Sequence, residues 1–327
     1  MQFIVHNRHN PFFNLASEEY LLKNSSDSYF MLWQNEPSVI VGCHQNTAAE
    51  VDLSKALEHN IKVARRITGG GAVYHDLGNV NFSLIENSSE NGNASNTYAE
   101  LSLPIIETLA KLGVKAELSG RNDIIADGKK IAGCAVNSWK KRTLLHGAML
   151  FSADLSMLAK VLTPHNSKFE GKAVQSVSSR VANVQQLLTS PIDALEFKQL
   201  LKNNIEKHFN CSSRDFTQIE LGEIEKLCQS KFALDEWNYN KVSPHSFSKV
   251  MRTSGGNVEV KMNFSGGRIE NIQLFGDFFS EDNIKELEKT LRGSLYSPEA
   301  VKTTLSSITL SNYIKEIKVD ELLSLMF

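Results

Sequence analysis

The chain has 327 residues, of which 41% are hydrophobic and 22% charged, and its 35 basic and 37 acidic residues give a formal net charge of −2. This balance argues against a nucleic-acid-binding surface or a polybasic membrane anchor, so phosphate binding would have to come from a few placed groups. Residues 1–11 lack the apolar core of a secretion signal, and no apolar run approaches the roughly 20 residues of a spanning helix. The four cysteines have no metal-ligand spacing, which favours a reducing cytoplasm.

The first half of the chain is rich in strand signals. Apolar runs and period-two alternation predict short strands at residues 29–33, 38–42, 61–67, 72–75 and 80–84. In the last of these, Val80, Phe82 and Leu84 alternate with Asn81 and Ser83. That pattern is typical of a strand that buries only one face.

Helices are expected between the strands. Apolar residues at helical spacing predict them at residues 101–112, 155–162 and 192–209. Residues 87–96 are rich in Asn, Ser and Gly, which is typical of a surface loop. Mostly antiparallel strands with intervening helices indicate an α+β fold with a large mixed or antiparallel sheet, rather than a doubly wound sheet.

A second, smaller unit is predicted to begin near Pro244. Residues 258–264 and 269–275 alternate on either side of a Gly-Gly turn, and helices are expected at 281–291 and 298–306. We therefore expect a large domain over residues 1–243 and a small C-terminal α/β domain over residues 247–327.

The strongest candidate for a ligand-binding segment spans residues 65–76 and reads RRITGGGAVYHD. Consecutive glycines let the backbone approach a ligand closely and turn several N–H groups toward it, which suits a phosphate or a carboxylate. A guanidinium would add a planar, always-charged partner for the same anion. The alternative is a tight hairpin with two solvated arginines. Neither the Walker A motif nor the dinucleotide fingerprint is present.

A second constellation surrounds the Asp-Gly pair at residues 127–128, a strong hairpin signal. A two-residue loop would pair Ile125 with Lys130. Asp123 would then face Ala132, and Asp123 and Lys130 would project from the same side as diagonal neighbours. The carboxylate could position the lysine or help hold a metal. The alternative is an exposed hairpin with ordinary charges, and one inserted residue would change the register.

Three further side chains are candidates on their own. His146 lies in an apolar strand over residues 144–150, and His75 lies within the glycine-containing segment at residues 65–76. A lone histidine in such a place is more often a satisfied core residue than a catalyst. Cys134 would share a face with Lys130 in a regular strand, but a buried free cysteine is inert unless its thiolate is stabilised.

Taken together, these segments resemble the lipoate–protein ligase family. Residues 65–79 are similar to its glycine-rich signature and residues 120–133 to its lysine motif. Further matches lie at residues 13–19 (FNLASEE), 145–147 (LHG) and 176–183 (SVSSRVAN). The likeness spans the large domain, and the C-terminal unit fits the accessory domain of the family. It implies a large sheet of the biotin/lipoate ligase type.

The resemblance implies a two-step reaction. Lipoate and ATP, with Mg²⁺, would give lipoyl-adenylate and pyrophosphate, and the acyl group would then move to a lysine of a carrier protein. The implied carriers are the lipoyl domains of 2-oxoacid dehydrogenase E2 subunits and the glycine cleavage H protein. Neither a nucleic acid nor a membrane is an expected partner, and the expected location is the cytoplasm.

The same resemblance gives roles to individual residues. Lys130 is implied to be the central catalytic lysine, in contact with both the carboxylate and the α-phosphate. The residues implied to bind ATP are Arg66, Gly71, Ala72, Val73, Tyr74 and Lys130. The residues implied to bind lipoate or the adenylate are Thr68, Gly70, Asn122, Asp123, Lys130 and His146. The metal ligands are not identified, although Asp123 could be one.

Two alternatives remain open at the level of sequence. Relatives that transfer octanoyl groups between carriers use a cysteine nucleophile, either three residues before the His-Gly pair or ahead of the lysine motif. This chain has Thr143 at the first place and no cysteine over residues 118–126. A non-catalytic acyl- or carrier-binding paralogue would be expected to lose Lys130 or the arginine pair, and both are present. The glycine-rich biotin motif of biotin ligases is not recognisable.

Overall fold

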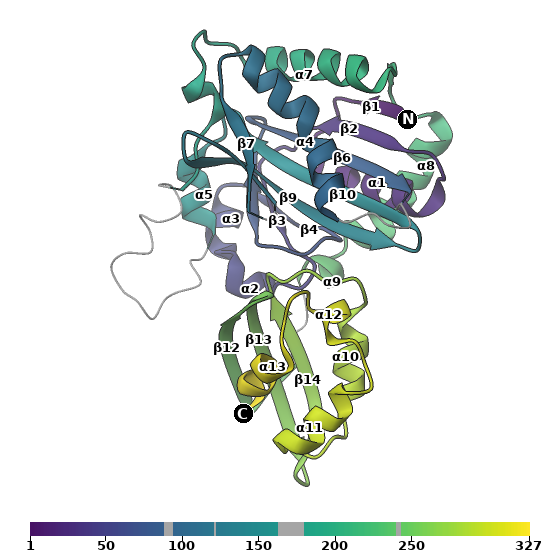
Figure 1. Cartoon of the computed structure of the whole chain (residues 1–327), viewed down its shortest axis with the longest axis vertical. Helices are drawn as coiled ribbons and strands as arrows, with labels where there is room; N and C mark the ends of the chain where they lie inside the picture. Colours follow the sequence, from purple (N-terminus) through teal and green to yellow (C-terminus); the bar gives the residue numbers. More distant parts are fainter. Residues whose placement is uncertain (88–93, 121, 163–179, 240–242) are drawn as a thin grey trace.

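The computed structural model describes residues 1–87, 94–120, 122–162, 180–239 and 243–327. Figure 1 shows an elongated molecule with a large part and a smaller C-terminal part. The large part contains an eight-stranded sheet in the order β11-β1-β2-β6-β10-β9-β8-β7. Its strands are β1 (Gln2–Val5), β2 (Tyr29–Trp33), β6 (Asn79–Asn87), β7 (Ala116–Ser119), β8 (Asp123–Ala126), β9 (Lys129–Trp139), β10 (Arg142–Leu150) and β11 (Ser213–Arg214).

The sheet is mixed. Strand β1 runs parallel to both of its neighbours, β2 and β11, whereas the remaining pairs are antiparallel. Helices alternate with these strands along the chain and are not confined to crossovers between parallel strands. The predicted α+β class with a large mixed sheet is therefore confirmed.

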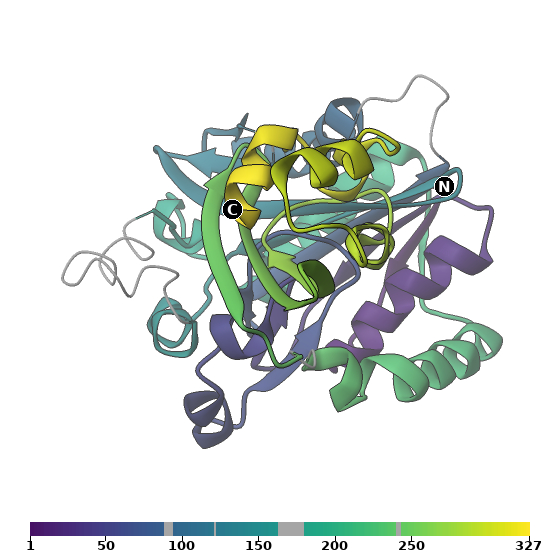
Figure 2. The same ribbon diagram turned by 90° about the horizontal axis from the view of Figure 1, so that it is seen from below.

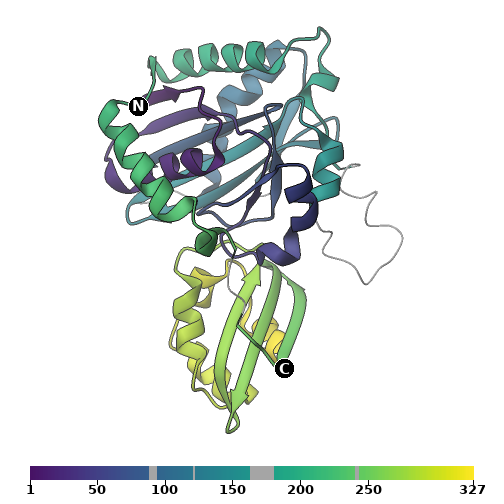
Figure 3. The ribbon, with the colours of Figure 1, turned by 180° about the vertical axis from the view of Figure 1, so that it is seen from behind.

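Helices cover both faces of this sheet (Figures 1 and 3). On one face, α4 (Ala94–Lys111) and α7 (Ala194–Phe209) bury Val80, Phe82 and Leu84 of β6 in a common core. On the other face lie α1 (Pro11–Asn24) and α8 (Gln218–Leu227), which contribute to a second core.

Strand β6 corrects one prediction. Asn81 and Ser83 are fully buried, so the strand is not half-exposed as its alternation indicated. The reason is α1, which packs on the polar face of β6 and gives Ser83 a partner in Glu18. Period-two alternation here marks a strand between an apolar core and a buried polar layer.

A second sheet carries the glycine segment. It has the order β4-β3-β5, with β3 (Ser38–Val41), β4 (Lys62–Arg65) and β5 (Val73–His75), and the glycines lie between β4 and β5. Its own small core includes side chains of helices α3 and α5. The short helices near it are α2 (Thr47–Glu50), α3 (Leu53–Glu58) and α5 (Leu155–Val161). Among the described residues before the C-terminal part, the remaining elements are η1 (Val184–Leu187), η2 (Cys228–Phe232) and α9 (Asp235–Asn238).

The C-terminal part has a three-stranded sheet and a separate core. Its elements are β12 (Phe247–Thr253), β13 (Gly256–Ser265), β14 (Arg268–Gly276), α10 (Ile284–Leu291), α11 (Pro298–Leu305), α12 (Leu310–Tyr313) and α13 (Val319–Met326). The helices gather on one side of the strands (Figures 1 and 2). Strands β13 and β14 were predicted, and Gly266 and Gly267 turn between them with positive φ angles of 55° and 72°. Strand β12 was not, because most of its residues are exposed and show no alternation.

The strand predicted at 29–33 has the predicted ends, and the other predicted elements are found with shifted ends. The strand predicted at 61–67 is shorter, at Lys62–Arg65, and the helix predicted at 101–112 begins earlier, at Ala94. Most of the loop predicted at 87–96, and the first part of the motif at 176–183, lie outside the described residues. Within the described part of the chain, no helix is both long enough and apolar enough to cross a bilayer.

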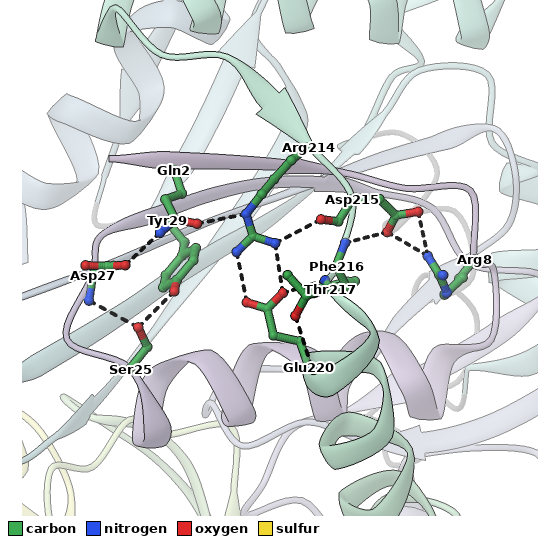
Figure 4. A network of polar contacts seen from close by, with 10 residues as sticks. All are labelled: Gln2, Arg8, Ser25, Asp27, Tyr29, Arg214, Asp215, Phe216, Thr217 and Glu220. Atoms are coloured by element: carbon green, nitrogen blue, oxygen red, sulfur yellow. Dashed lines mark hydrogen bonds and ion pairs between the residues drawn. The ribbon is translucent and has the colours of Figure 1, made fainter.

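A polar network holds the edge of the large sheet (Figure 4). The guanidinium of Arg214 on β11 donates to both carboxylate oxygens of Glu220 at 2.8 Å, and its Nε donates to Gln2 of β1. Arg8 forms an ion pair with Asp215 at 2.8 Å. Since the edge strand β11 has only two residues, these side chains fix the path of the chain into α8.

Direct contacts join the two parts of the molecule. The His44 ring stacks on Phe278, with centroids 4.6 Å apart, and its Nε2 lies 2.7 Å from the Ser280 hydroxyl. Gly276 donates its N–H to the His44 carbonyl. A Cβ added to Gly69 would lie 2.4 Å from the carbonyl oxygen of Phe278. The C-terminal part therefore touches the glycine segment itself.

The His44 contact should be acid-sensitive. Burial lowers the pKa of His44 from 6.5 to about 4, and the charge of Arg65 acts in the same direction. Between these two values the unfolded chain binds a proton that the folded chain does not, so stability is lost as the pH falls through this window. Chemical denaturation of the wild type and of His44→Gln at both ends of the window should show a smaller acid loss in the variant. Parallel losses would contradict the assignment.

Candidate active site

A cavity of about 280 Å³ lies where the glycine segment meets β9 and β10. Of the eleven residues that the resemblance implies to bind ATP, lipoate or the adenylate, nine line it: Arg66, Gly70, Gly71, Ala72, Val73, Tyr74, Asn122, Lys130 and His146. Thr68 and Asp123 do not line it but contact residues that do. The structure thus brings together side chains from segments up to 80 residues apart along the chain.

The apolar part of the cavity wall could not be named from the sequence. It comes from α1, three strands and the α5 region: Leu15, Trp33, Ile40, Leu150, Leu158 and Leu162. Each of these residues reads as ordinary core in its own segment. Only the packing of the two sheets and α1 exposes them to a common space, so no local pattern could have identified them.

Lys130 and Asp123 form an ion pair, with Nζ and Oδ1 2.7 Å apart and both side chains about one-third exposed, at 39% and 34%. The predicted register is correct for Ile125 opposite Lys130 but wrong beyond it. A bulge shifts the pairing, so that Asp123 faces Gly133 and not Ala132. The absence of a side chain at Gly133 leaves room for the lysine, because a Cβ there would lie 2.7 Å from Lys130 Nζ.

The backbone of Lys130 is held from the side opposite β8. Its N–H donates to the Arg180 carbonyl at 2.9 Å, and its carbonyl accepts from Ala182 at 3.0 Å. Asn183 in turn exchanges two side-chain hydrogen bonds with the backbone of Ala153. The described end of the motif at 176–183 therefore acts as a support for the lysine, a role that the sequence did not reveal.

Asn122 stabilises the other end of the bulge. Its side chain donates to the Cys134 carbonyl at 2.6 Å, and its carbonyl accepts the Cys134 N–H at 2.8 Å. Because both bonds go to one residue, the strand after Gly133 cannot slide without breaking them. Asn122 therefore fixes the register that places Asp123 beside the lysine.

Both arginines of the glycine segment are buried, at 2% exposure for Arg65 and 6% for Arg66, so the alternative with two solvated arginines is wrong. Arg66 donates from Nε to the Thr68 hydroxyl, from Nη1 to the Ile40 carbonyl, and from Nη2 to the carbonyls of Gly69 and Gly71. Burial lowers the pKa of Arg66 to about 10, which leaves it charged at neutral pH. The guanidinium therefore braces the glycine loop and also lines the cavity.

His146 does not stand alone in its strand. Its Nδ1 lies 2.9 Å from both carboxylate oxygens of Glu18 on α1, and its Nε2 lies 2.8 Å from the Thr68 hydroxyl. Glu18 is fully buried. The opening-helix motif contained Glu18, yet nothing in the local pattern distinguished it from Glu19 as a partner of the histidine.

The other two isolated candidates, His75 and Cys134, also line the cavity, but both are buried. His75 accepts a hydrogen bond at Nδ1 from Asn35, and burial lowers its pKa to about 3. Burial raises the pKa of Cys134 to about 12, although the charge of Lys130 opposes this. The thiol therefore remains protonated at neutral pH, and a thiolate nucleophile is not available there.

The possible metal ligands near Lys130 suit an ion that takes most of its ligands from a bound substrate. The described residues contain no group of three or more His, Cys, Asp or Glu side chains that could cage an ion. Mg²⁺, however, commonly takes one or two carboxylates and completes its shell with phosphates and water. The partly exposed carboxylate of Asp123 meets that smaller requirement.

Comparison with known proteins identifies the family. Residues 10–206 match the lipoyl protein ligase A/B catalytic domain, and residues 243–326 match the bacterial lipoate protein ligase C-terminus. The chain is 39% identical to lipoate–protein ligase 1 of Staphylococcus aureus over the full length of both proteins. The chain belongs to the lipoate–protein ligase family. The predicted family and enzyme class, a ligase, are thereby confirmed.

Solved structures of lipoate–protein ligases share the fold. LipL1 of P. falciparum in complex with lipoate is 28% identical, with a TM-score of 0.81 over 99% of this chain and 98% of that one. A lipoate–protein ligase A bound with ATP is 29% identical, with a TM-score of 0.64 over 74% of this chain and all of that one. A bipartite ligase of Thermoplasma acidophilum, studied with its E2 lipoyl domain, is 29% identical, with a TM-score of 0.66 over 76% of this chain and all of that one.

Gly133→Ala should move the Lys130 amine without removing it. The added methyl would meet Cε and Nζ of Lys130 at 2.7 Å, and the flexible end of the lysine can give way. We expect a stable protein whose ligase activity falls about tenfold or more, because a displaced charge no longer meets the reacting atoms. Gly222→Ala, at an open position of α8, is the matched control and should gain up to about 1 kcal/mol of stability with normal activity. Equal activities of the two variants would refute the role of Gly133.

Proposed function

We propose that this ligase activates lipoate with ATP and then attaches the lipoyl group to a lysine of a carrier protein. The observation that carries the proposal is the placement of Lys130, whose amine reaches a cavity also lined by the glycine segment. A fixed cation beside a run of backbone N–H groups suits a reaction in which a carboxylate meets a phosphate. The lipoate-bound and ATP-bound relatives support both substrates.

In the first step, a carboxylate oxygen of lipoate attacks the α-phosphorus of ATP. A new phosphorus–oxygen bond forms, the bond to the bridging oxygen breaks, and pyrophosphate leaves. Negative charge gathers around the α-phosphorus in the transition state, where the Lys130 ammonium would stabilise it. Asp123 would orient that ammonium through their ion pair.

The surrounding groups have complementary roles in the proposal. Arg66 and the backbone of residues 71–74 would hold the phosphates and the nucleoside, and Gly70 would allow close approach because its φ of 90° suits glycine. Thr68, Asn122 and His146 would order the lipoate and adenylate site. Mg²⁺, held by the ATP phosphates and by Asp123, would supply additional charge neutralisation. The apolar wall would receive the aliphatic tail of lipoate.

In the second step, the amine of a carrier lysine attacks the carbonyl carbon of the adenylate. An amide bond forms, AMP leaves, and the amine loses a proton. We propose the lipoyl domains of 2-oxoacid dehydrogenase E2 subunits and the glycine cleavage H protein as carriers, and the cytoplasm as the location. Residues 1–243 would form the catalytic domain and residues 247–327 the accessory domain.

The test is pyrophosphate release from ATP with lipoate present and no carrier protein. Lys130→Ala should lower this release about 100-fold or more while the protein stays folded, because it removes the cation that meets the developing charge. Lys129→Ala removes the adjacent, exposed lysine and should act like the wild type. Normal release by Lys130→Ala would refute the assignment, and no release by folded wild type would refute adenylation.

Cys134→Ala should retain most of the pyrophosphate release. The thiol is buried and its pKa is raised to about 12, so neither step uses it as a nucleophile. Thermal unfolding measured alongside separates a packing loss from a chemical one. Loss of all pyrophosphate release in a variant that remains folded would contradict this prediction and would place the thiol in the reaction.

A further inference from the structure

A chain of hydrogen bonds runs behind the cavity wall, from the opening helix to the glycine loop. Ser83 donates to Glu18 at 2.5 Å, and Glu18 meets Nδ1 of His146 at 2.9 Å. Nε2 of His146 meets Thr68, which accepts from Arg66 at 2.9 Å. All five of these residues are at most 7% exposed. His146 and Arg66 line the cavity, whereas Glu18 and Thr68 stand behind it.

The donors at the two ends limit the directions of these hydrogen bonds. Trp33 Nε1 can only donate, so Ser83 accepts its N–H and gives its own hydroxyl proton to Glu18. Arg66 can likewise only donate, so the Thr68 hydroxyl accepts from it and is free to donate to Nε2 of His146. The Glu18 carboxylate can only accept, so the proton of its bond with His146 belongs to Nδ1 of the ring. These directions favour the Nδ1–H tautomer of His146.

The chain also contains two groups of opposite charge, Glu18 and Arg66. Burial lowers the pKa of the Arg66 guanidinium, whereas Cys43 and, to a smaller extent, the Glu18 carboxylate act to raise it. A buried charge is tolerated when it is paired and hydrogen-bonded. The guanidinium that Glu18 helps to keep charged is the one that holds the carbonyls of Gly69 and Gly71.

We propose that Glu18 is a positioning residue for the adenylation step. It holds His146 as the Nδ1–H tautomer and, through Thr68 and Arg66, sets the conformation of the glycine loop at residues 68–71. The proposal rests on the proposed function, because the loop is taken to bind the nucleotide. Glu18 itself touches neither substrate. Its effect is to give the loop one conformation before ATP arrives, so that binding energy is not used to order it.

The neighbouring Glu19 provides a matched control. It has the same charge, lies on the same helix and is 4% exposed, but it forms ion pairs with Lys23 and Lys231 at 2.6 Å and 2.5 Å. Neither lysine lines the cavity. Glu19→Gln should therefore lower the thermal stability and leave the kinetics of pyrophosphate release unchanged at temperatures well below unfolding.

The kinetic experiment compares Glu18→Gln, Thr68→Val, the double variant and Glu19→Gln in lipoate-dependent pyrophosphate release. Glu18→Gln and Thr68→Val should each lower kcat/KM about 10- to 100-fold, the scale on which removing an outer partner of a metal-bound histidine acts. Because both act through one chain, the double variant should lose little more than either single variant. Thr68→Ser keeps the hydroxyl and should restore most of the activity.

A spectroscopic measurement tests the same chain without turnover. The ¹⁵N shifts of the His146 ring should show the Nδ1–H tautomer in the wild type and a mixture in Glu18→Gln. An Nε2–H tautomer in the wild type, multiplied losses in the double variant, or normal kinetics in Glu18→Gln would each overturn the proposal. No pyrophosphate release by the wild type would overturn the proposed function itself, and an active wild type with an equally active Glu18→Gln would overturn only the role of Glu18.

Discussion

The two adjacent buried arginines are the constraint on which the rest of the structure depends. A guanidinium brought out of water must find an acceptor for nearly every N–H, and these two find them mainly on backbone carbonyls. Arg65 reaches the carbonyls of residues 42, 43, 45, 237 and 238. Arg66 reaches residues 40, 69 and 71. Arg65 thus joins the small sheet to the segment that precedes the C-terminal part. Arg66 joins the glycine loop to the end of β3.

The sequence predicted best where a local rule decides the structure. The Asp-Gly turn at residues 127–128 adopts positive φ angles of 50° and 69°, as a two-residue hairpin requires, and the first pair of the register follows from it. The bulge beyond that pair could not be read. It depends on Asn122, which bonds the backbone of Cys134, and on the support that Arg180 gives to Lys130. The first is a side-chain contact across the hairpin, which no propensity rule predicts, and the second joins segments about 50 residues apart along the chain.

The same division applies to the site. Residues of the glycine-rich motif and of the lysine motif line the same cavity. Each motif places its residues close together along the chain, so its local pattern could be recognised in the sequence. The groups that hold those residues were missed. Ser83 was predicted on the polar face of a half-buried strand, and Glu18 was noted only as part of the motif at residues 13–19. The two form a buried polar layer only when α1 packs on β6. Arg66 lies at the cavity, but no sequence pattern indicated that its N–H groups would be bonded within the loop.

The contact between Gly69 and the backbone of Phe278 has a thermodynamic consequence. The glycine loop lines the cavity and also contacts the C-terminal part. Ligand binding in the cavity and docking of the C-terminal part are therefore coupled, and one coupling free energy describes the effect of each on the other. A ligand that shifts Gly69 toward Phe278 must weaken the docking, and the docked state must weaken the binding of that ligand by the same factor. A ligand that leaves Gly69 in place does not change the free energy with which the C-terminal part docks. Substrate, intermediate and product can therefore differ in their effect on the docking free energy between the two parts of the molecule.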